Sequence, residues 1–162
     1  MNTDFLKSES RINLMRAFAG ESQARNRYTF AQCTAEQNNF FALGQVFKFT
    51  AGQEKAHAEV FYNLMKQSAG INTEITASYP ADVYDDISKL LQCSVHNEND
   101  EAETIYPSFA ETAKKEGFPE IASKFILIAG IEEIHRRRFE YFENPDSSKT
   151  MAESITINVG FR

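Results

Sequence analysis

The residues in this sequence whose types and spacing best suit chemistry are two copies of Glu-x-x-His. Glu54 and His57 form the first copy, and Glu132 and His135 form the second, 78 residues later (132 − 54). Both copies lie in the same longer pattern, F-x-x-x-A-G-x-E-x-x-H-x-x-x-F. Residues three positions apart share one face of an α-helix, so each copy predicts a carboxylate and an imidazole side by side. Such a pair can bind a metal ion.

Each pair interrupts a row of apolar residues that has the spacing of a helix packed in a bundle. The rows step by three and four residues and comprise Phe47, Thr50, Glu54, His57, Phe61 and Leu64, then Phe125, Ile128, Glu132, His135, Phe139 and Phe142. The Glu and His residues therefore take positions that core residues such as leucine normally occupy. Burying a carboxylate without a partner costs several kcal/mol, so a metal centre inside the bundle is the simplest explanation.

Two further glutamates take core positions elsewhere in the chain. Glu21 follows Leu14 by seven residues, and Glu98 follows Leu91 by seven residues. Both carboxylates are therefore predicted on the buried face of a helix. Glu21 precedes the first Glu-x-x-His by 33 residues (54 − 21), and Glu98 precedes the second by 34 (132 − 98). The second half of the chain thus repeats the first.

This arrangement gives one glutamate from each of two helices and one Glu-x-x-His from each of two others. It is the signature of ferritin-like di-iron and di-manganese carboxylate bundles. Mixed carboxylate and imidazole ligands suit iron, with manganese as the alternative. Cys33 and Cys93 are far apart and do not form a C-x-x-C pair, which argues against a structural zinc or iron–sulfur site. We therefore expect two iron ions.

The elements that must position these residues are four helices. We predict an all-α, ferritin-like four-helix bundle with one long crossover over residues 71–80. The first predicted helix begins at Ser8 or Ser10 and ends near Ala35. The second follows the turn at Gln37–Asn39 and ends near Gly70. The third begins near Asp82, and the fourth extends from Pro119 to Glu143. Pro107 is expected to kink or end the third helix near Thr104. Gly52 and Gly130 lie mid-helix and are expected to allow close helix approach.

The bundle is expected to form one domain over residues 1–144. Residues 145–162 form a separate tail, in which apolar and polar residues alternate over 153–161. Such alternation predicts a short strand.

Composition and charge restrict the classes of partner. The 162 residues suit one domain, and 42% are hydrophobic and 25% charged, as in ordinary globular proteins. The net charge of −6 argues against nucleic acid as a partner, because phosphate binding requires a basic surface. No apolar run approaches the roughly 20 residues needed to span a bilayer, and the N-terminus lacks the apolar core of a signal peptide. Together with two unpaired cysteines, this predicts a cytoplasmic protein.

Several segments resemble rubrerythrin. They are F-A-G-E-S-Q-A-R-N-R-Y at 18–28, E-K-A-H-A at 54–58, E-x-x-E at 98–101, Y-P-S-F-A at 106–110 and E-G-F at 116–118. The likeness extends over nearly all of residues 8–143, and the first segment is long and specific. The resemblance implies a non-haem di-iron centre that reduces hydrogen peroxide to water.

Carried over position by position, the resemblance implies seven metal ligands: Glu21, Glu54, His57, Glu98, Glu101, Glu132 and His135. In the family one iron moves between the histidine matched by His57 and the extra carboxylate matched by Glu101 as the pair changes oxidation state. Tyr28 and Tyr106 match tyrosines that lie near the irons and complete the expected catalytic set. Without the resemblance, these two tyrosines read as plain core aromatics.

The sequence departs from the family pattern at one point. Typical members carry a rubredoxin domain with two C-x-x-C pairs, and this sequence has neither. Residues 145–162 are either a remnant or truncated start of that domain, or an edge that pairs with another subunit. We expect a separate electron donor such as rubredoxin, and a homodimer.

Two other functions fit the same metal centre: a ferritin-like ferroxidase or iron store, and an oxidase that reduces O₂. Glu101 favours the peroxide reductase, because plain ferritin-like sites use one carboxylate on that helix.

Overall fold

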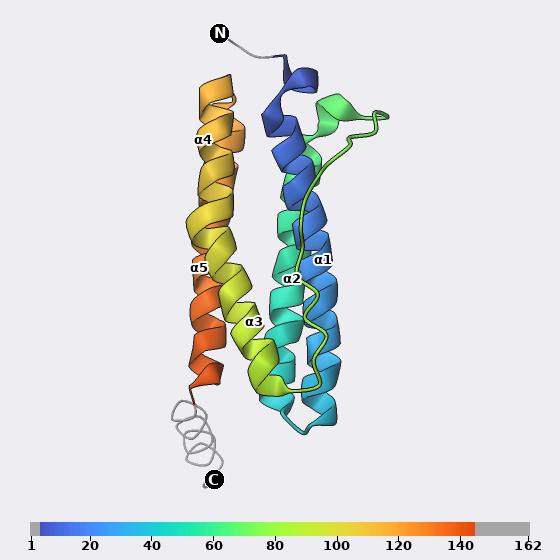
Figure 1. Cartoon of the computed structure of the whole chain (residues 1–162), viewed down its shortest axis with the longest axis vertical. Helices are drawn as coiled ribbons and strands as arrows, with labels where there is room; N and C mark the ends of the chain where they lie inside the picture. The colour runs from blue at the N-terminus through green and yellow to red at the C-terminus, as the bar shows by residue number, and fades with distance from the viewer. Residues whose placement is uncertain (1–3, 145–162) are drawn as a thin grey trace, which may run out of the picture.

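The structure, a computed structural model, describes residues 4–144 and is built from helices joined by one long crossover (Figure 1). The principal helices are α1 (Glu9–Gln37), α2 (Phe41–Leu64), α3 (Ile87–Asp100), α4 (Tyr106–Glu116) and α5 (Pro119–Glu143). Short 3₁₀ helices lie at Phe5–Lys7 and Lys66–Ser68, and a π-helical turn, η3 (Glu101–Ile105), joins α3 to α4. The predicted four-helix bundle with a long crossover is therefore confirmed, with α3, η3 and α4 together making its third helix.

Local sequence signals account for most helix ends. The Ser8 hydroxyl accepts a hydrogen bond from the backbone N–H of Arg11 at 3.1 Å and caps α1, as expected for a serine before the first turn. Gly117 ends α4 with a φ of 88°, a left-handed conformation that glycine adopts without steric cost. Helix α5 has the predicted bounds.

The two ends of the crossover differ from the prediction. Helix α2 ends at Leu64, earlier than predicted, and Gly70 lies in a later turn with a φ of 78°. Helix α3 begins at Ile87, because the Asp86 carboxylate accepts hydrogen bonds from the first backbone N–H groups of the helix. Asp82 does not start a helix; its carboxylate binds the Arg27 side chain at 2.7 Å. The crossover therefore spans residues 69–86.

The predicted interruption near Thr104 takes the form of a π-helical turn. Eight residues separate Glu98 from Tyr106, whereas seven separate Glu21 from Tyr28 in α1. The π-helical turn Glu101–Ile105 absorbs this extra residue without ending the helix. Pro107 is the second residue of α4 and directly follows this turn, so it lies where the α-helical hydrogen-bond pattern is already interrupted.

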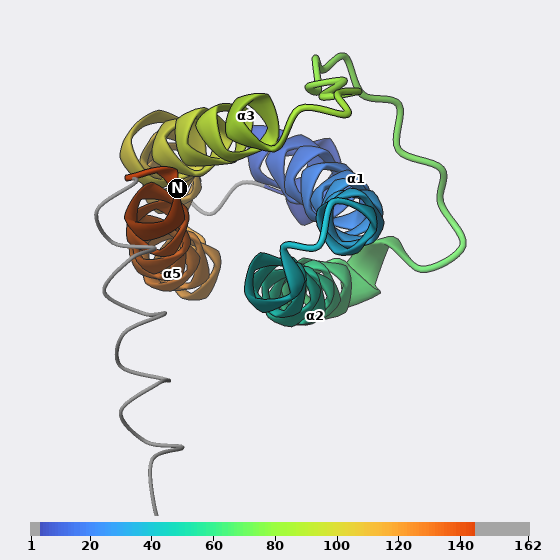
Figure 2. The same cartoon turned by 90° about the horizontal axis from the view of Figure 1, so that it is seen from below.

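The bundle consists of two helical pairs. Helix α1 packs mainly on α2, and α5 packs mainly on α3 and α4, with fewer contacts between the pairs. The end-on view shows both pairs (Figure 2). The polar residues of the two Glu-x-x-His motifs lie where the pairs face each other.

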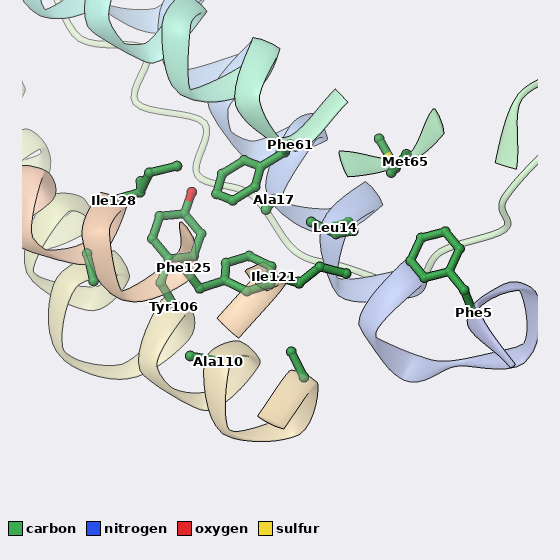
Figure 3. Close-up of a cluster of buried hydrophobic side chains, with 12 residues drawn as sticks. Phe5, Leu14, Ala17, Phe61, Met65, Tyr106, Ala110, Ile121, Phe125 and Ile128 are labelled. Carbon is green, nitrogen blue, oxygen red and sulfur yellow. The ribbon is translucent and has the colours of Figure 1, made fainter. Parts of the chain in front are cut away.

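Aromatic side chains close the bundle core on both sides of these motifs. On one side Phe61 packs on Phe125 and Tyr106, with ring centroids 5.1 and 5.5 Å apart (Figure 3). On the other side Phe47 packs on Phe139 at 5.3 Å. All four repeat phenylalanines have no exposed surface. The motif residues are thus sealed between two apolar layers.

Two further predictions concern the mid-helix glycines and the C-terminal tail. Gly52 and Gly130 are exposed, and no atom of the described residues lies within 4 Å of a Cβ built on either. The prediction that they allow close helix approach is therefore wrong for contacts within the described chain. The predicted C-terminal strand and the boundary at residue 144 concern residues 145–162, which lie outside the described residues.

Candidate metal centre

The structure brings six of the seven predicted ligands together at the middle of the bundle. They form two clusters whose ligand atoms lie within 4.8 Å of one another. The first cluster contains Glu21, Glu54, His57 and Glu132, and the second contains Glu54, Glu98, Glu132 and His135. Glu54 and Glu132 belong to both. A centre with two terminal Glu–His pairs and two shared carboxylates is the arrangement that holds two metal ions in a carboxylate bundle.

The His57 ring faces three carboxylates. Its Nδ1 atom lies 2.8 Å from Glu132 Oε1, 3.3 Å from Glu54 Oε2 and 3.5 Å from Glu21 Oε2. These oxygens come from α5, α2 and α1, so the first cluster joins both helical pairs.

The His135 ring repeats this arrangement in the other half. Its Nδ1 atom lies 2.7 Å from Glu132 Oε2, 3.0 Å from Glu54 Oε1 and 3.5 Å from Glu98 Oε2. The two imidazoles lie nearly parallel, with centroids 5.6 Å apart and an interplanar angle of 19°. The two halves of the sequence repeat thus become two nearly equivalent halves of one site.

Unsatisfied polar atoms converge on the centre. Eight buried atoms of the centre have no hydrogen-bond partner outside the centre among the described residues: Glu21 Oε2, both carboxylate oxygens of Glu54 and of Glu132, Glu98 Oε2, and the Nδ1 atoms of His57 and His135. Buried polar groups are rarely left without partners, because desolvation then goes uncompensated. Oxygen and imidazole donors aimed at two common points fit two divalent ions of the iron or manganese type.

The two tyrosines singled out by sequence reasoning hold the terminal glutamates across the bundle. The Tyr28 hydroxyl donates a hydrogen bond to Glu98 Oε1, and the Tyr106 hydroxyl donates one to Glu21 Oε1. Both tyrosines are 1% exposed. Each tyrosine leaves the other carboxylate oxygen of its partner free to face the centre.

The comparison with known proteins agrees with this geometry. The model of the rubrerythrin family matches residues 13–143. The chain belongs to the rubrerythrin family. It is 43% identical to a rubrerythrin of Porphyromonas gingivalis over 86% of the chain and 68% of that protein, and 40% identical to a rubrerythrin of Nitratidesulfovibrio vulgaris over 82% and 68%. The chain thus spans about two thirds of the length of these rubrerythrins.

Solved structures show the same fold. The fully reduced, all-ferrous state of nigerythrin superposes with a TM-score of 0.74 at 24% identity, covering 88% of this chain and 72% of that one. Symerythrin from Cyanophora paradoxa, reduced with dithionite, superposes with a TM-score of 0.67 at 19% identity over 78% and 79%. Within residues 4–144, no helix of this rubrerythrin-family chain is long and apolar enough to cross a membrane.

The seventh predicted ligand, Glu101, lies apart from the other six. It lies in the π-helical turn and belongs to neither cluster. It lines a cavity together with Gly20 and Tyr106, and its Oε1 atom lies 3.8 Å from a Cβ built on Gly20. Glu101 is thus a neighbour of the centre on the side of Glu21.

Sequence reasoning missed two residues that orient a ligand. The Gln53 side-chain oxygen lies 3.2 Å from Nε2 of His135 and accepts a hydrogen bond from Arg138 at 2.9 Å. A donor at Nε2 leaves the Nδ1 lone pair of His135 directed at the carboxylates, and such partners hold metal-binding imidazoles in place. Gln53 directly precedes Glu54, but its type and position carry no signal that separates it from a surface glutamine.

The charges of the metal-free centre compensate one another. Although burial alone would lower the pKa of His135, hydrogen bonding to Glu132, Glu54 and Glu98 raises it to about 12. Burial would raise the pKa of Glu54, but hydrogen bonding to His135 and His57 lowers it to about 2. Burial, together with the charge of Glu54, raises the pKa of Glu98 to about 8. Without metal the centre therefore retains protons that metal binding must displace.

Proposed function

We propose that this chain is a non-haem di-iron oxidoreductase that reduces hydrogen peroxide to water. Membership of the rubrerythrin family and the buried carboxylate–histidine cluster support a di-iron protein of oxidative-stress defence. The single observation that carries the proposal is the pair of clusters sharing Glu54 and Glu132, with eight unsatisfied atoms directed at them.

In this proposal the bound iron pair supplies the two electrons that split the O–O bond and the Lewis acidity that orients it. Glu54 and Glu132 belong to both clusters and would help to hold both ions. Glu21 and His57 would complete the ligands of one ion, and Glu98 and His135 those of the other. Manganese is the alternative metal, since the same donors accept it.

The chain's own residues then prepare the site for reduction. The aromatic layers around Phe61 and Phe47 keep bulk water from the centre, where charges interact more strongly. Tyr28 and Tyr106 fix the terminal carboxylates through their hydrogen bonds. Glu101 lies beside Glu21 and next to the cavity, and we assign to it two roles: an alternative ligand to His57, as the family resemblance implies, and a proton donor to the departing oxygen.

The electrons come from outside these 162 residues in this proposal. Cys33 and Cys93 are both free and do not form a C-x-x-C pair, so the sequence offers no rubredoxin-type iron site. A separate protein such as rubredoxin is the proposed donor, and a homodimer the proposed assembly.

Anaerobic stopped-flow spectroscopy tests the proposal. The protein is loaded with two ferrous equivalents and mixed either with hydrogen peroxide or with air-saturated buffer. We expect oxidation to be far faster with peroxide, at one peroxide per two irons. Comparable or faster oxidation by O₂ would instead indicate an oxidase or a ferroxidase. Failure to take up two metal ions would overturn the di-metal assignment itself.

A further inference from the structure

A cavity beside the proposed metal centre is covered by a tyrosine of the crossover. The cavity has a volume of about 370 Å³ and lies between α1, the π-helical turn and the crossover. Its inner wall includes Gly20, Glu101 and Tyr106. Tyr106 hydrogen-bonds Glu21, so the inner wall lies one side chain from the centre.

The outer wall of the cavity is formed by exposed residues. Ser78 and Thr104 line it and are exposed, as is Tyr79, which is 39% exposed. The cavity therefore connects solvent with Glu101. Most of its lining surface is apolar, and Glu101 is one of the few acidic groups in it, so a small uncharged molecule suits it.

Tyr79 lies across this connection. Its Cε1 atom is 3.4 Å from a Cβ built on Gly20, so the ring packs on the bare backbone of α1. The same constructed Cβ lies 3.8 Å from Glu101 Oε1. The ring and the Glu101 carboxylate therefore both lie beside Gly20, at the inner end of the cavity.

The crossover is tied to α1 on both sides of Tyr79. The Tyr79 hydroxyl donates a hydrogen bond to the Arg16 carbonyl at 2.7 Å, and the Arg16 side chain donates one to the Thr76 carbonyl at 3.1 Å. The Gln23 side chain donates a hydrogen bond to the Pro80 carbonyl. Figure 1 shows the crossover running beside α1. These bonds hold the Tyr79 ring in place over Gly20.

We propose that this cavity is the route by which small molecules and ions reach the metal centre, and that Tyr79 determines specificity by restricting the route to oxidants of the size of hydrogen peroxide. The inference rests on the proposed function for its substrate, but the route itself depends only on the cavity. Gly20 is required because a side chain there would narrow the inner end. Tyr79 acts by shape, since its hydroxyl is already engaged by the Arg16 carbonyl.

Opposing variants test the route. Tyr79→Ala removes the ring and opens the cavity, whereas Gly20→Ala adds a methyl group beside both Tyr79 and Glu101. Tyr79→Phe keeps the ring and loses only the hydroxyl bond to Arg16. Tyr84→Ala is the matched control, because Tyr84 lies on the same crossover, is 44% exposed and does not line this cavity.

The first readout is independent of turnover. Uptake of cobalt(II) by the metal-free protein is followed by visible absorption. We expect uptake to be faster in Tyr79→Ala, slower in Gly20→Ala and unchanged in Tyr84→Ala. Equal uptake rates in all variants would overturn the route. Because alanine favours a helix over glycine, Gly20→Ala keeps the test decisive even if Tyr79→Ala unfolds.

The second readout is the ratio of the rates at which hydrogen peroxide and cumene hydroperoxide oxidise the ferrous protein. Tyr79→Ala is expected to shift this ratio about tenfold toward the bulky hydroperoxide, as loss of one steric contact typically does. Tyr79→Phe is expected to keep the original ratio. An unchanged ratio in Tyr79→Ala would overturn the role of Tyr79. Absence of any reaction with hydrogen peroxide would instead contradict the proposed function, while cobalt uptake would still decide the route.

Discussion

The two halves of the candidate metal centre contain the same residue types but differ in what lies one helical turn beyond Glu21 and Glu98. In α1, three residues after Glu21, the chain has Ala24, which is 2% exposed and packs in an apolar cluster. Three residues after Glu98 it has Glu101, in the π-helical turn and beside a cavity. The repeat thus builds a nearly symmetric set of candidate ligands, whereas Ala24 and Glu101, at equivalent positions, make its surroundings asymmetric. The residues that form the ligand clusters are therefore different from those that line the cavity.

The largest effect is expected from removing a ligand that both halves share. Glu132→Gln should reduce bound iron from two per chain to less than one, because Glu132 faces both histidines. Loss of a residue that merely orients a ligand costs about 10–100-fold in metal affinity, and loss of a shared ligand should cost more. Metal analysis after gel filtration measures this. Glu133→Gln is the control, since Glu133 binds Arg136 and Arg137 instead; equal metal loss in both would contradict the shared role.

The second prediction removes the asymmetry. Glu101→Ala gives the π-helical turn η3 the residue type that α1 has at Ala24, and it should leave two irons bound because Glu101 belongs to neither cluster. Oxidation by peroxide should slow by about 10²-fold, the usual loss when a positioned proton donor is removed. Stopped-flow kinetics measure the rate, with the exposed Glu103→Ala in the same turn as the control. Loss of one iron in Glu101→Ala would show that Glu101 is needed to hold metal.

The third prediction concerns the charge that both halves carry without metal. Burial raises the pKa of Glu98 to about 8, so the folded protein retains a proton that the unfolded chain releases above its ordinary value of 4.5. Stability should therefore fall as pH rises from about 4.5 to 8. Burial would lower the pKa of His135, but hydrogen bonding to carboxylates outweighs it and raises this pKa to about 12. The contribution of His135 to stability is therefore complete below its ordinary pKa of 6.5 and is lost as pH rises toward 12. Both groups thus make the folded protein less stable as pH rises.

Thermal melts of metal-free and iron-loaded protein test this charge balance. The melting temperature of the metal-free protein should fall by on the order of 10 °C between about pH 5 and pH 8. The iron-loaded protein should change less over this range, because metal replaces those protons. A rising melting temperature in the metal-free protein would contradict the balance of charges described above.

The smallest effects are expected from replacing Tyr28 or Tyr106, which hold equivalent glutamates in the two halves of the centre. Tyr28→Phe and Tyr106→Phe each leave a buried carboxylate oxygen without its donor. Each should lower the free energy of unfolding by about 1–3 kcal/mol, as measured by chemical denaturation. Tyr106 also lines the cavity, so Tyr106→Phe alone should alter the rate with peroxide. Equal kinetic effects of both variants would show that the halves are equally accessible.

The sequence predicted the centre because its ligands violate a strong pattern. Glu54 and His57 interrupt an apolar row, and the repeat places Glu132 and His135 in the same relation, so burial and proximity both follow from helical periodicity. The order of the helices and the bounds of α5 follow from equally local signals.

The remaining features depend on contacts between distant residues. Asp82 and Asp86 both resemble helix caps in the sequence, and only the bond of Asp82 to Arg27 on α1 decides between them. Tyr79 acquires its position from hydrogen bonds to α1 some 60 residues earlier. Gly52 and Gly130 were expected at a close helix contact, but periodicity does not reveal which glycines face a neighbour. Glu101 was expected at the centre from the family resemblance, but the sequence did not show that it lies in a π-helical turn beside a cavity.

The division of the bundle into two helical pairs has a consequence for how the chain folds. Contacts within each pair connect residues close in sequence, and such contacts form quickly because little loop-closure entropy is lost. Docking of the two preformed pairs then buries four glutamates, Glu21, Glu54, Glu98 and Glu132, and removing these carboxyl groups from water opposes this late step. Divalent ions present during synthesis should therefore accelerate the final step of folding more than the first, and the assembly of this protein becomes linked to the supply of metal in the cell.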